Sequence, residues 1–133
     1  MTIFSKIIAR EIPSYKIAED ENFFAFLDIN PLAKGHTLVV PKQEIDYIFD
    51  LEDKTLTDMM LFSKKVAKAI EKTIPCQRVG LTVIGLEVPH AHIHLVPINK
   101  ESDIYFGSPK LKLEVAEFNQ IAQEITNNYN KLD

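Results

Sequence analysis

The sequence predicts an α+β fold, in which helices cover an antiparallel sheet. Segments with helical and with strand patterns follow one another without regular βαβ alternation, and several connections between the expected strands are short, which favours antiparallel pairing. The chain has 133 residues, close to the commonest size of a domain. We therefore expect a single domain over residues 1–133.

The composition excludes several classes of protein. Hydrophobic residues make up 46% and charged residues 26% of the chain, unlike a disordered protein. The formal net charge is -4 and the basic residues are scattered, so we expect no long nucleic acid as a partner. No segment approaches the roughly 20 apolar residues of a membrane span. Cys76 is the single cysteine, which together with the lack of an export signal suits a reducing cytoplasm.

The first expected element is a short helix over residues 2–10. Its apolar residues recur at helical spacing, namely Ile3, Phe4, Ile7 and Ile8. Thr2 or Ser5 is a suitable N-cap because a hydroxyl accepts a hydrogen bond from a free backbone N–H. Pro13 is expected to close the segment.

Two buried strands are expected next. Residues 23–28 are rich in aromatic side chains and stop at the turn signal Asn30-Pro31. Residues 37–40 form a second apolar run between a glycine and a proline. Both runs have the length and composition of buried strands.

The longest helix is expected in the centre of the chain. Asp50 with Asp53 is typical of a helix start, and Pro75 marks the end. The apolar stripe between them consists of Leu56, Met59, Met60, Phe62, Val66, Ile70 and Ile74.

Two further β-rich runs cover residues 79–84 and 91–98. A segment with Gly85 and Pro89 joins them, so we expect neighbouring antiparallel strands. After a break at residues 107–109, a last amphipathic helix is expected, whose apolar stripe consists of Val115, Phe118, Ile121, Ala122, Ile125 and Tyr129.

Three of the four histidines alternate with apolar residues. In a strand, side chains two apart share a face, so His90, His92 and His94 are expected to point the same way, each about 7 Å from the next. Imidazole is suited to chemistry near neutral pH because its ordinary pKa is about 6.5.

Three interpretations of this row are open. The histidines can be ordinary polar residues, or zinc ligands that leave one position open. They can also be a metal-free row in which one imidazole attacks phosphorus while others bind oxygens or move protons. A spacing of about 7 Å is wide for ligands about 2 Å from one ion, and no cysteine is near. The pattern favours the metal-free row, with no metal ligand and no cofactor.

Residues 90–96, with the sequence HAHIHLV, resemble the motif of the histidine triad (HIT) superfamily. Further segments are similar to its Hint-type branch: IFSKII at 3–8, EIP at 11–13, FLDINP at 26–31 and GHTLVVPK at 35–42. The resemblance implies a five-stranded antiparallel sheet with a long central helix and a C-terminal helix. It also implies a homodimer across a two-fold axis and a nucleotide lying over the triad strand.

The resemblance implies a role for each histidine. His92 is similar to the nucleophile that attacks the α-phosphorus and forms a transient nucleotidyl-histidine, which water then hydrolyses. His94 and His36 would bind and polarise phosphate oxygens. His90 would fix the tautomer of His92 by hydrogen bonding.

The resemblance also implies residues that bind the nucleoside. Asp28 would accept hydrogen bonds from both ribose hydroxyls; its alternative is a turn residue before Asn30-Pro31. Ile29, Phe4 and Ile7 would line the slot for the base. For Phe4 and Ile7, plain packing in a short helix is the alternative.

The loop before the triad departs from the Hint pattern. It is short, Ile84 stands near the position of an expected asparagine, and Glu87 replaces a Ser or Thr that assists the leaving group. Glu87 is interpreted as a proton donor, as a group that repels a second phosphate, or as a solvated carboxylate. With Gly85 and Val88 it is expected to contact substrate.

The first helix and the tail also differ from some relatives. Thr2 and Ser5 occupy the positions of a zinc-binding cysteine pair, so no structural zinc is expected. The chain has no Trp, unlike the animal Hint proteins, and is more similar to bacterial members.

The first functional hypothesis is a phosphoramidase-like hydrolase that releases a purine nucleoside monophosphate such as AMP from a conjugate. The alternatives are a dinucleoside polyphosphate hydrolase, as in the Fhit branch, and a nucleotide-binding regulatory protein without catalysis.

Overall fold

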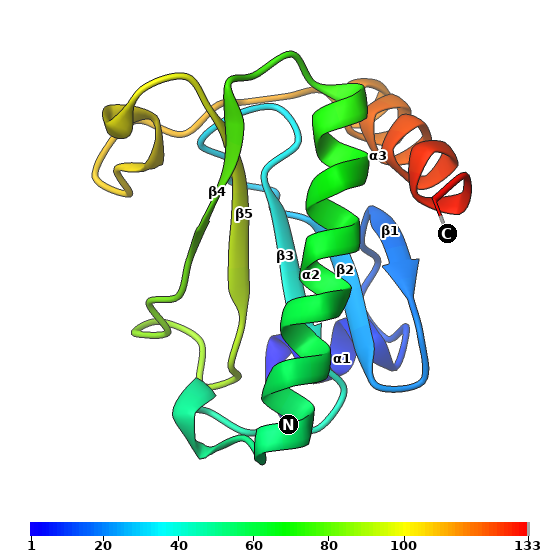
Figure 1. Cartoon of the computed structure of the whole chain (residues 1–133), viewed down its shortest axis with the longest axis vertical. Helices are drawn as coiled ribbons and strands as arrows, with labels where there is room; N and C mark the ends of the chain where they lie inside the picture. The colour runs from blue at the N-terminus through cyan, green and yellow to red at the C-terminus, as the bar shows by residue number, and fades with distance from the viewer. Residues whose placement is uncertain (133) are drawn as a thin grey trace.

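The computed structural model describes residues 1–132. Its elements are α1 (Ile3–Ile8), β1 (Lys16–Glu19), β2 (Phe23–Leu27), β3 (Thr37–Pro41), the 3-10 turn η1 (Ile48–Asp50), α2 (Asp53–Thr73), β4 (Arg78–Thr82), β5 (Ile93–Ile98), the 3-10 turn η2 (Glu101–Ile104) and α3 (Val115–Asn130). The strands form one antiparallel sheet in the order β1-β2-β3-β5-β4 (Figure 1). The predicted α+β class, with a five-stranded antiparallel sheet, is confirmed.

The main core lies between the sheet and α2, which runs across one face of it (Figure 1). Strand residues two apart share this face, and Val39, Ile93 and Leu95 pack there with Met59 and Val66 of α2. Helix α3 closes the same layer beside α2 and β1. Each large apolar side chain buried here stabilises the fold by about 1.5–3 kcal/mol, so this layer dominates the packing energy.

The opposite face of the sheet carries a smaller core and the histidines. Phe26, Leu38 and the α1 residues Phe4 and Ile7 belong to this second cluster. Leu38 pairs with Phe26 on one side and with His94 on the other, so these three side chains form a row across the sheet. The sheet therefore separates the main core from the histidine face.

The three predicted helices are present, with adjusted ends. Thr2 caps α1, since its hydroxyl accepts a hydrogen bond from the Ser5 amide. Helix α1 ends at Ile8, well before Pro13, and Arg10 adopts a left-handed backbone with φ 64°. Helix α3 begins only at Val115 because the preceding segment is extended and bonded to the loop before β3.

Strand β1 has no counterpart in the sequence-based expectation. It has four residues, only two of them buried, and it pairs with β2 alone through an irregular register. Such a short edge strand carries too few alternating apolar positions to be recognised from its pattern.

The two strands that flank the pre-triad loop are shorter than predicted. Strand β4 ends at Thr82 rather than at residue 84, and β5 begins at Ile93 rather than at residue 91. Their antiparallel pairing is confirmed. His90 and His92 thus precede the strand, and the expectation that all three histidines lie in one strand is wrong.

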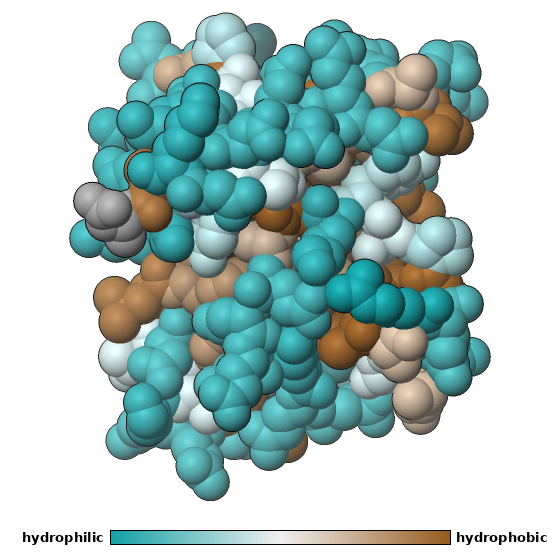
Figure 2. Space-filling model, turned by 90° about the vertical axis from the view of Figure 1, so that its right-hand side faces the viewer, coloured by the Kyte–Doolittle hydropathy of each residue, from teal (hydrophilic) through white to brown (hydrophobic). Residues whose placement is uncertain are grey.

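The surface on the side of α3 and β1 is mostly hydrophilic, with hydrophobic patches between the polar side chains (Figure 2). Among residues 1–132, no helix combines the length and the apolar character that a membrane span requires.

Candidate active site

The four histidines gather on one face of the sheet from distant parts of the chain. His36 precedes β3, His90 and His92 lie before β5, and His94 lies within β5. All four side chains are buried. The ring centroids of His92 and His94 are 4.9 Å apart, and those of His36 and His94 are 5.2 Å apart. The rings of His92 and His94 are therefore closer together than the spacing of about 7 Å expected for residues two apart in a strand.

The hydrogen bond of His92 determines its tautomer. Nδ1 lies 2.7 Å from the backbone carbonyl oxygen of His90. A carbonyl oxygen only accepts, so Nδ1 carries the proton and Nε2 presents its lone pair. Burial lowers the pKa of His92, which keeps the ring neutral near pH 7. The arrangement suits a nucleophile, and His90 contributes to it through its backbone rather than its ring.

His36 and His94 form a directed pair. The Leu32 amide donates to Nδ1 of His36 at 3.0 Å, so the proton of His36 is on Nε2. That Nε2–H donates to Nδ1 of His94, also at 3.0 Å. His94 consequently keeps its own proton on Nε2. Burial, with the neighbouring charges, lowers the pKa of His36 to about 3 and that of His94 to about 4, so both rings are neutral donors near pH 7.

His90 is bonded at both ring nitrogens. Its Nε2 donates to the Pro41 carbonyl at 2.8 Å, which leaves Nδ1 to accept from the Thr2 hydroxyl at 2.7 Å. The side chain is fully buried. His90 therefore joins α1 to β3 and has no nitrogen free for a substrate.

A hydrogen-bonded cluster of Thr2, Ser5, Glu44 and His90 holds α1 in place. Glu44 accepts from the Thr2 amide at 2.8 Å and from the Ser5 hydroxyl at 2.6 Å. Helix α1 in turn places Phe4 against His92, with ring centroids 5.0 Å apart in an edge contact. Phe4 and Ile7 are both buried, which agrees with the packing interpretation of these two residues.

We expect Thr2→Val to destabilise the fold by about 1–3 kcal/mol, because it removes the N-cap of α1 and leaves Nδ1 of the buried His90 without its donor. Urea denaturation at pH 7 measures this change. Thr2→Ser is the matched control, since it keeps the hydroxyl and is expected to lose less than half as much. Equal losses in both variants would contradict a role for the hydroxyl.

Asp28 follows β2 and faces the histidine pair. Its Oδ1 accepts from the Asn30 amide at 2.8 Å, as a turn residue does, and its Oδ2 lies 3.6 Å from Nε2 of His36. Burial is the largest cause of the raised pKa of Asp28. Ile29, next in the chain, is exposed at the rim. Asp28 thus holds the turn through Oδ1 and presents Oδ2 to the histidines.

The loop before the triad, residues 83–89, borders the histidines from the other side. Gly85 has a left-handed backbone with φ 72°, which favours glycine. Val88 packs against the cluster that contains Phe4, and Glu87 is exposed. The negative charge of Glu87 is a minor influence on both groups: it opposes the lowering of the His92 pKa by burial, and it adds to the raising of the Asp28 pKa by burial.

Asp28, His36 and His94 offer ligand atoms within 4.8 Å of one another. The two nitrogens that face each other, however, already share a proton at 3.0 Å. The Leu32 amide holds His36 in the tautomer that makes this bond. A metal held by all three residues would therefore have to displace this hydrogen bond.

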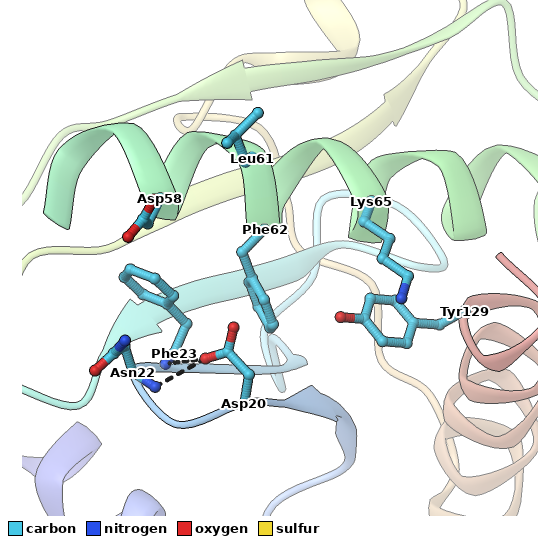
Figure 3. A pocket seen from close by; sticks show the side chains of 8 residues that line it. All are labelled: Asp20, Asn22, Phe23, Asp58, Leu61, Phe62, Lys65 and Tyr129. Atoms are coloured by element: carbon cyan, nitrogen blue, oxygen red, sulfur yellow. Dashed lines mark hydrogen bonds between the residues drawn. The ribbon is translucent and has the colours of Figure 1, made fainter. Parts of the chain in front are cut away.

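A separate hollow of about 310 Å³ lies between α2, the β1–β2 turn and α3 (Figure 3). Its lining is Asp20, Asn22, Phe23, Asp58, Leu61, Phe62, Lys65 and Tyr129. Lys65 lies over the Tyr129 ring, and Asp20 accepts from two backbone amides of the turn. No histidine lines this hollow, so the candidate site remains at the histidines.

Comparison with known sequences points to one family. Residues 9–101 match the HIT domain. An uncharacterized HIT-like protein of Borreliella burgdorferi is 37% identical, with 95% of this chain and 96% of the relative covered. The adenosine 5'-monophosphoramidase HNT1 of Saccharomyces cerevisiae is also 37% identical, with 92% and 79% covered.

Solved structures share the fold over nearly the whole chain. A Hit-like protein from Bartonella henselae superposes with a TM-score of 0.83 at 29% identity, covering 96% of this chain and 95% of that one. A Zn-bound histidine triad family protein from Mycobacterium smegmatis gives 0.85 at 25% identity, covering 98% and 94%.

Proposed function

Because this chain belongs to the HIT domain family, we propose that it is a nucleotide hydrolase that releases a nucleoside monophosphate from a conjugate through attack by His92. The tautomer of His92 is the observation that carries this proposal. Its Nε2 lone pair is held ready by the bond from Nδ1 to a backbone carbonyl, beside a neutral donor on His94.

The reaction has two displacement steps. First, Nε2 of His92 forms a bond to the α-phosphorus, and the bond to the leaving group breaks with its electron pair, after which the leaving group takes up a proton from solvent. The His92 ring then carries a positive charge, which the carbonyl bonded to Nδ1 stabilises. Second, water attacks phosphorus and releases a proton to solvent, and the N–P electron pair returns to Nε2 as the monophosphate leaves.

His94 assists by donating to a phosphate oxygen, and His36 supports it. Nε2–H of His94 is the free donor of the pair, and negative charge that builds up on the phosphate is stabilised by a preoriented donor in a site with little water. His36 acts through His94, since its own Nε2–H is bonded there. Asp28 is proposed to accept from the ribose hydroxyls, and Ile29 to contact a purine base.

Two features favour an amine as the leaving group. The Saccharomyces cerevisiae relative and a relative from Schizosaccharomyces pombe, 36% identical, are adenosine 5'-monophosphoramidases. The exposed carboxylate of Glu87 acts electrostatically on His92. The negative charge of this carboxylate repels a second phosphate, which is also negative. It favours instead an amine leaving group, which must gain a proton.

The proposal is tested by turnover of a fluorogenic adenosine 5'-phosphoramidate at neutral pH in the presence of EDTA. We expect turnover that EDTA leaves unchanged. Faster hydrolysis of diadenosine polyphosphate would favour the dinucleoside alternative. AMP binding without turnover of either substrate would contradict the hydrolase and favour the regulatory alternative.

We also propose that the chain forms a homodimer through α2 and β4. Met60 and Leu61 on α2 and Leu81 on β4 expose large apolar side chains around one hollow. Strand β4 is an edge strand, whose free backbone groups are available for pairing with another chain. Within residues 1–132, the buried hydroxyl of Ser63 beside this hollow has no hydrogen-bond partner. A second copy covers all three features at once.

Leu81→Glu is expected to convert the dimer to a monomer. A two-fold interface contains the substitution twice, so losing about 1.5–3 kcal/mol per leucine weakens association by roughly 10²–10⁴-fold. Light scattering after size exclusion measures the mass. Val115→Glu, a change at an exposed apolar residue at the start of α3, is the matched control and should remain dimeric. A monomeric wild type would contradict the proposed dimer.

A further inference from the structure

The segment that follows β5 folds back over the histidine pair. It contains η2, then runs across one end of the sheet to reach α3 (Figure 1). The ring of Phe106 meets His94 edge-on, with centroids 4.7 Å apart at 74°, and meets His36 at 6.0 Å and 85°. One aromatic side chain therefore contacts both partners of the His36–His94 hydrogen bond.

The segment around Phe106 is closed by its own hydrogen bonds. At its start, the Asp103 carboxylate accepts from the amides of Asn99 and Lys100, at 2.8 and 3.1 Å. Beyond Phe106, Nζ of Lys110 donates to the carbonyl of Phe106 at 2.5 Å and to that of Ser108 at 3.0 Å. These bonds fix the backbone that carries the Phe106 ring.

A further bond joins this segment to the strand connection that presents His36. The Leu111 amide donates to the Pro31 carbonyl at 2.9 Å, and the next residue, Leu32, donates to Nδ1 of His36. Phe106 and His36 are thus held by two parts of one bonded unit. The position of the ring over the histidine pair is built into the fold.

An aromatic ring at this place has two physical effects. It excludes water from a hydrogen bond between two neutral imidazoles, and a low dielectric strengthens that bond and disfavours a charged ring. Its edge contacts also limit rotation of the His94 ring. If His94 took a proton on Nδ1, it would face the Nε2–H of His36 and the bond would be lost.

We propose that Phe106 is a positioning residue of the hydrolase: it shields the His36–His94 hydrogen bond and thereby keeps the free proton of His94 on Nε2. The effect of Phe106 on kinetics rests on the proposed function, whereas its shielding of the hydrogen bond does not. The other groups that face the pair are Asp28 and His92, with Lys110 acting on His36 and Glu87 on Asp28 and His92.

The shielding is tested by NMR titration of the histidine rings in Phe106→Ala, Phe106→Leu and the wild type. In the wild type we expect His36 and His94 to stay neutral at pH 5, because their pKa values lie at about 3 and about 4. Phe106→Ala is expected to raise the pKa of His94 by at least about 1 unit as water enters. Phe106→Leu, which remains apolar and retains most of the volume, should shift it less.

Kinetics provide the second readout. For adenosine 5'-phosphoramidate, Phe106→Ala is expected to lower kcat by roughly 10-fold with little change in KM, and to move the acid limb of the pH profile to higher pH. Phe49→Ala, at an exposed aromatic residue of η1, is the matched control and should change neither.

The outcomes separate the two proposals. A His94 pKa that is equal in the wild type and in Phe106→Ala would overturn the shielding. A raised pKa in a protein that turns over no nucleotide would support the shielding and contradict the hydrolase. If Phe106→Ala does not fold, Phe106→Gln replaces it in both measurements, because a polar side chain larger than alanine still lets water reach the pair. An unshifted His94 pKa together with an unchanged kcat in that variant would overturn the proposal.

Discussion

Replacing His92 with alanine is expected to reduce turnover of adenosine 5'-phosphoramidate on the order of 10⁴-fold or more, the scale seen when a covalent nucleophile is removed. The reason is specific to this ring. His92 is the histidine whose Nδ1 is bonded to a carbonyl and whose Nε2 is therefore a free lone pair. The nitrogens of His90 are both bonded, and Nε2 of His94 carries a proton, so neither ring replaces it.

The intermediate gives an independent check of this result. Rapid quenching of the wild type with substrate should leave one nucleotidyl group on the peptide that contains His92, and none in His92→Ala. AMP binding by the variant, followed by calorimetry, controls for a damaged site. Unchanged turnover in His92→Ala, or an adduct on another residue, would contradict nucleophilic attack by His92.

Acidification is expected to lower the free energy of unfolding by about 4 kcal/mol between pH 7 and pH 5. His36 and His94 have folded pKa values of about 3 and about 4, below the ordinary value of 6.5. Between the folded pKa values and 6.5, the two rings bind protons in the unfolded chain but not in the folded chain. The free energy of unfolding therefore falls as the pH falls below 6.5. At pH 5 each ring contributes about 2 kcal/mol to this loss, at about 1.4 kcal/mol per pH unit.

The other groups with shifted pKa values change the stability between pH 7 and pH 5 less than His36 and His94 do. Hydrogen bonds from Lys42 and Lys16 lower the pKa of Glu19 to about 2 from 4.5, so its stabilisation is lost only below pH 4.5. The raised pKa of Asp28 acts in the opposite direction, because its protonation relieves the cost of a buried charge as the pH falls. His92, whose pKa is also lowered, adds to the loss.

Urea denaturation at pH 7, 6 and 5 measures this dependence. His94→Gln retains an oxygen that accepts from His36 but removes one titrating ring. It should reduce the slope of stability against pH by about half. A wild-type stability that is constant over this range would show that the pair is not held neutral.

Local patterns were sufficient for most elements of the fold. The helix of residues 53–73 and the strands β2 and β3 follow from apolar periodicity and from Gly and Pro at their ends. Strand β1 was missed because its stability comes from pairing with β2 rather than from its own four residues. The apolar stripe of α3 begins at Val115, where the helix begins, and the segment between the break at 107–109 and this residue is extended, with the Leu111 amide bonded to the Pro31 carbonyl.

The candidate site divides in the same way. The alternation of three histidines is visible in the sequence and led to the proposed chemistry, while the resemblance added His36 and Asp28. Nothing local indicates Phe106, since its contacts depend on how the segment after β5 folds back. Nor does the sequence reveal that His92 is bonded to the backbone of His90 rather than to its ring.

The sequence by itself therefore determined the fold class, the helices, four of the strands and the identity of the histidine motif, because periodicity and turn residues act within a few positions. The tertiary structure alone decided which nitrogen of each histidine carries its proton. His36 and His94 are 58 positions apart, and a ring's tautomer depends on the partners that folding brings to its two nitrogens. The proposed chemistry at His92 depends on that assignment.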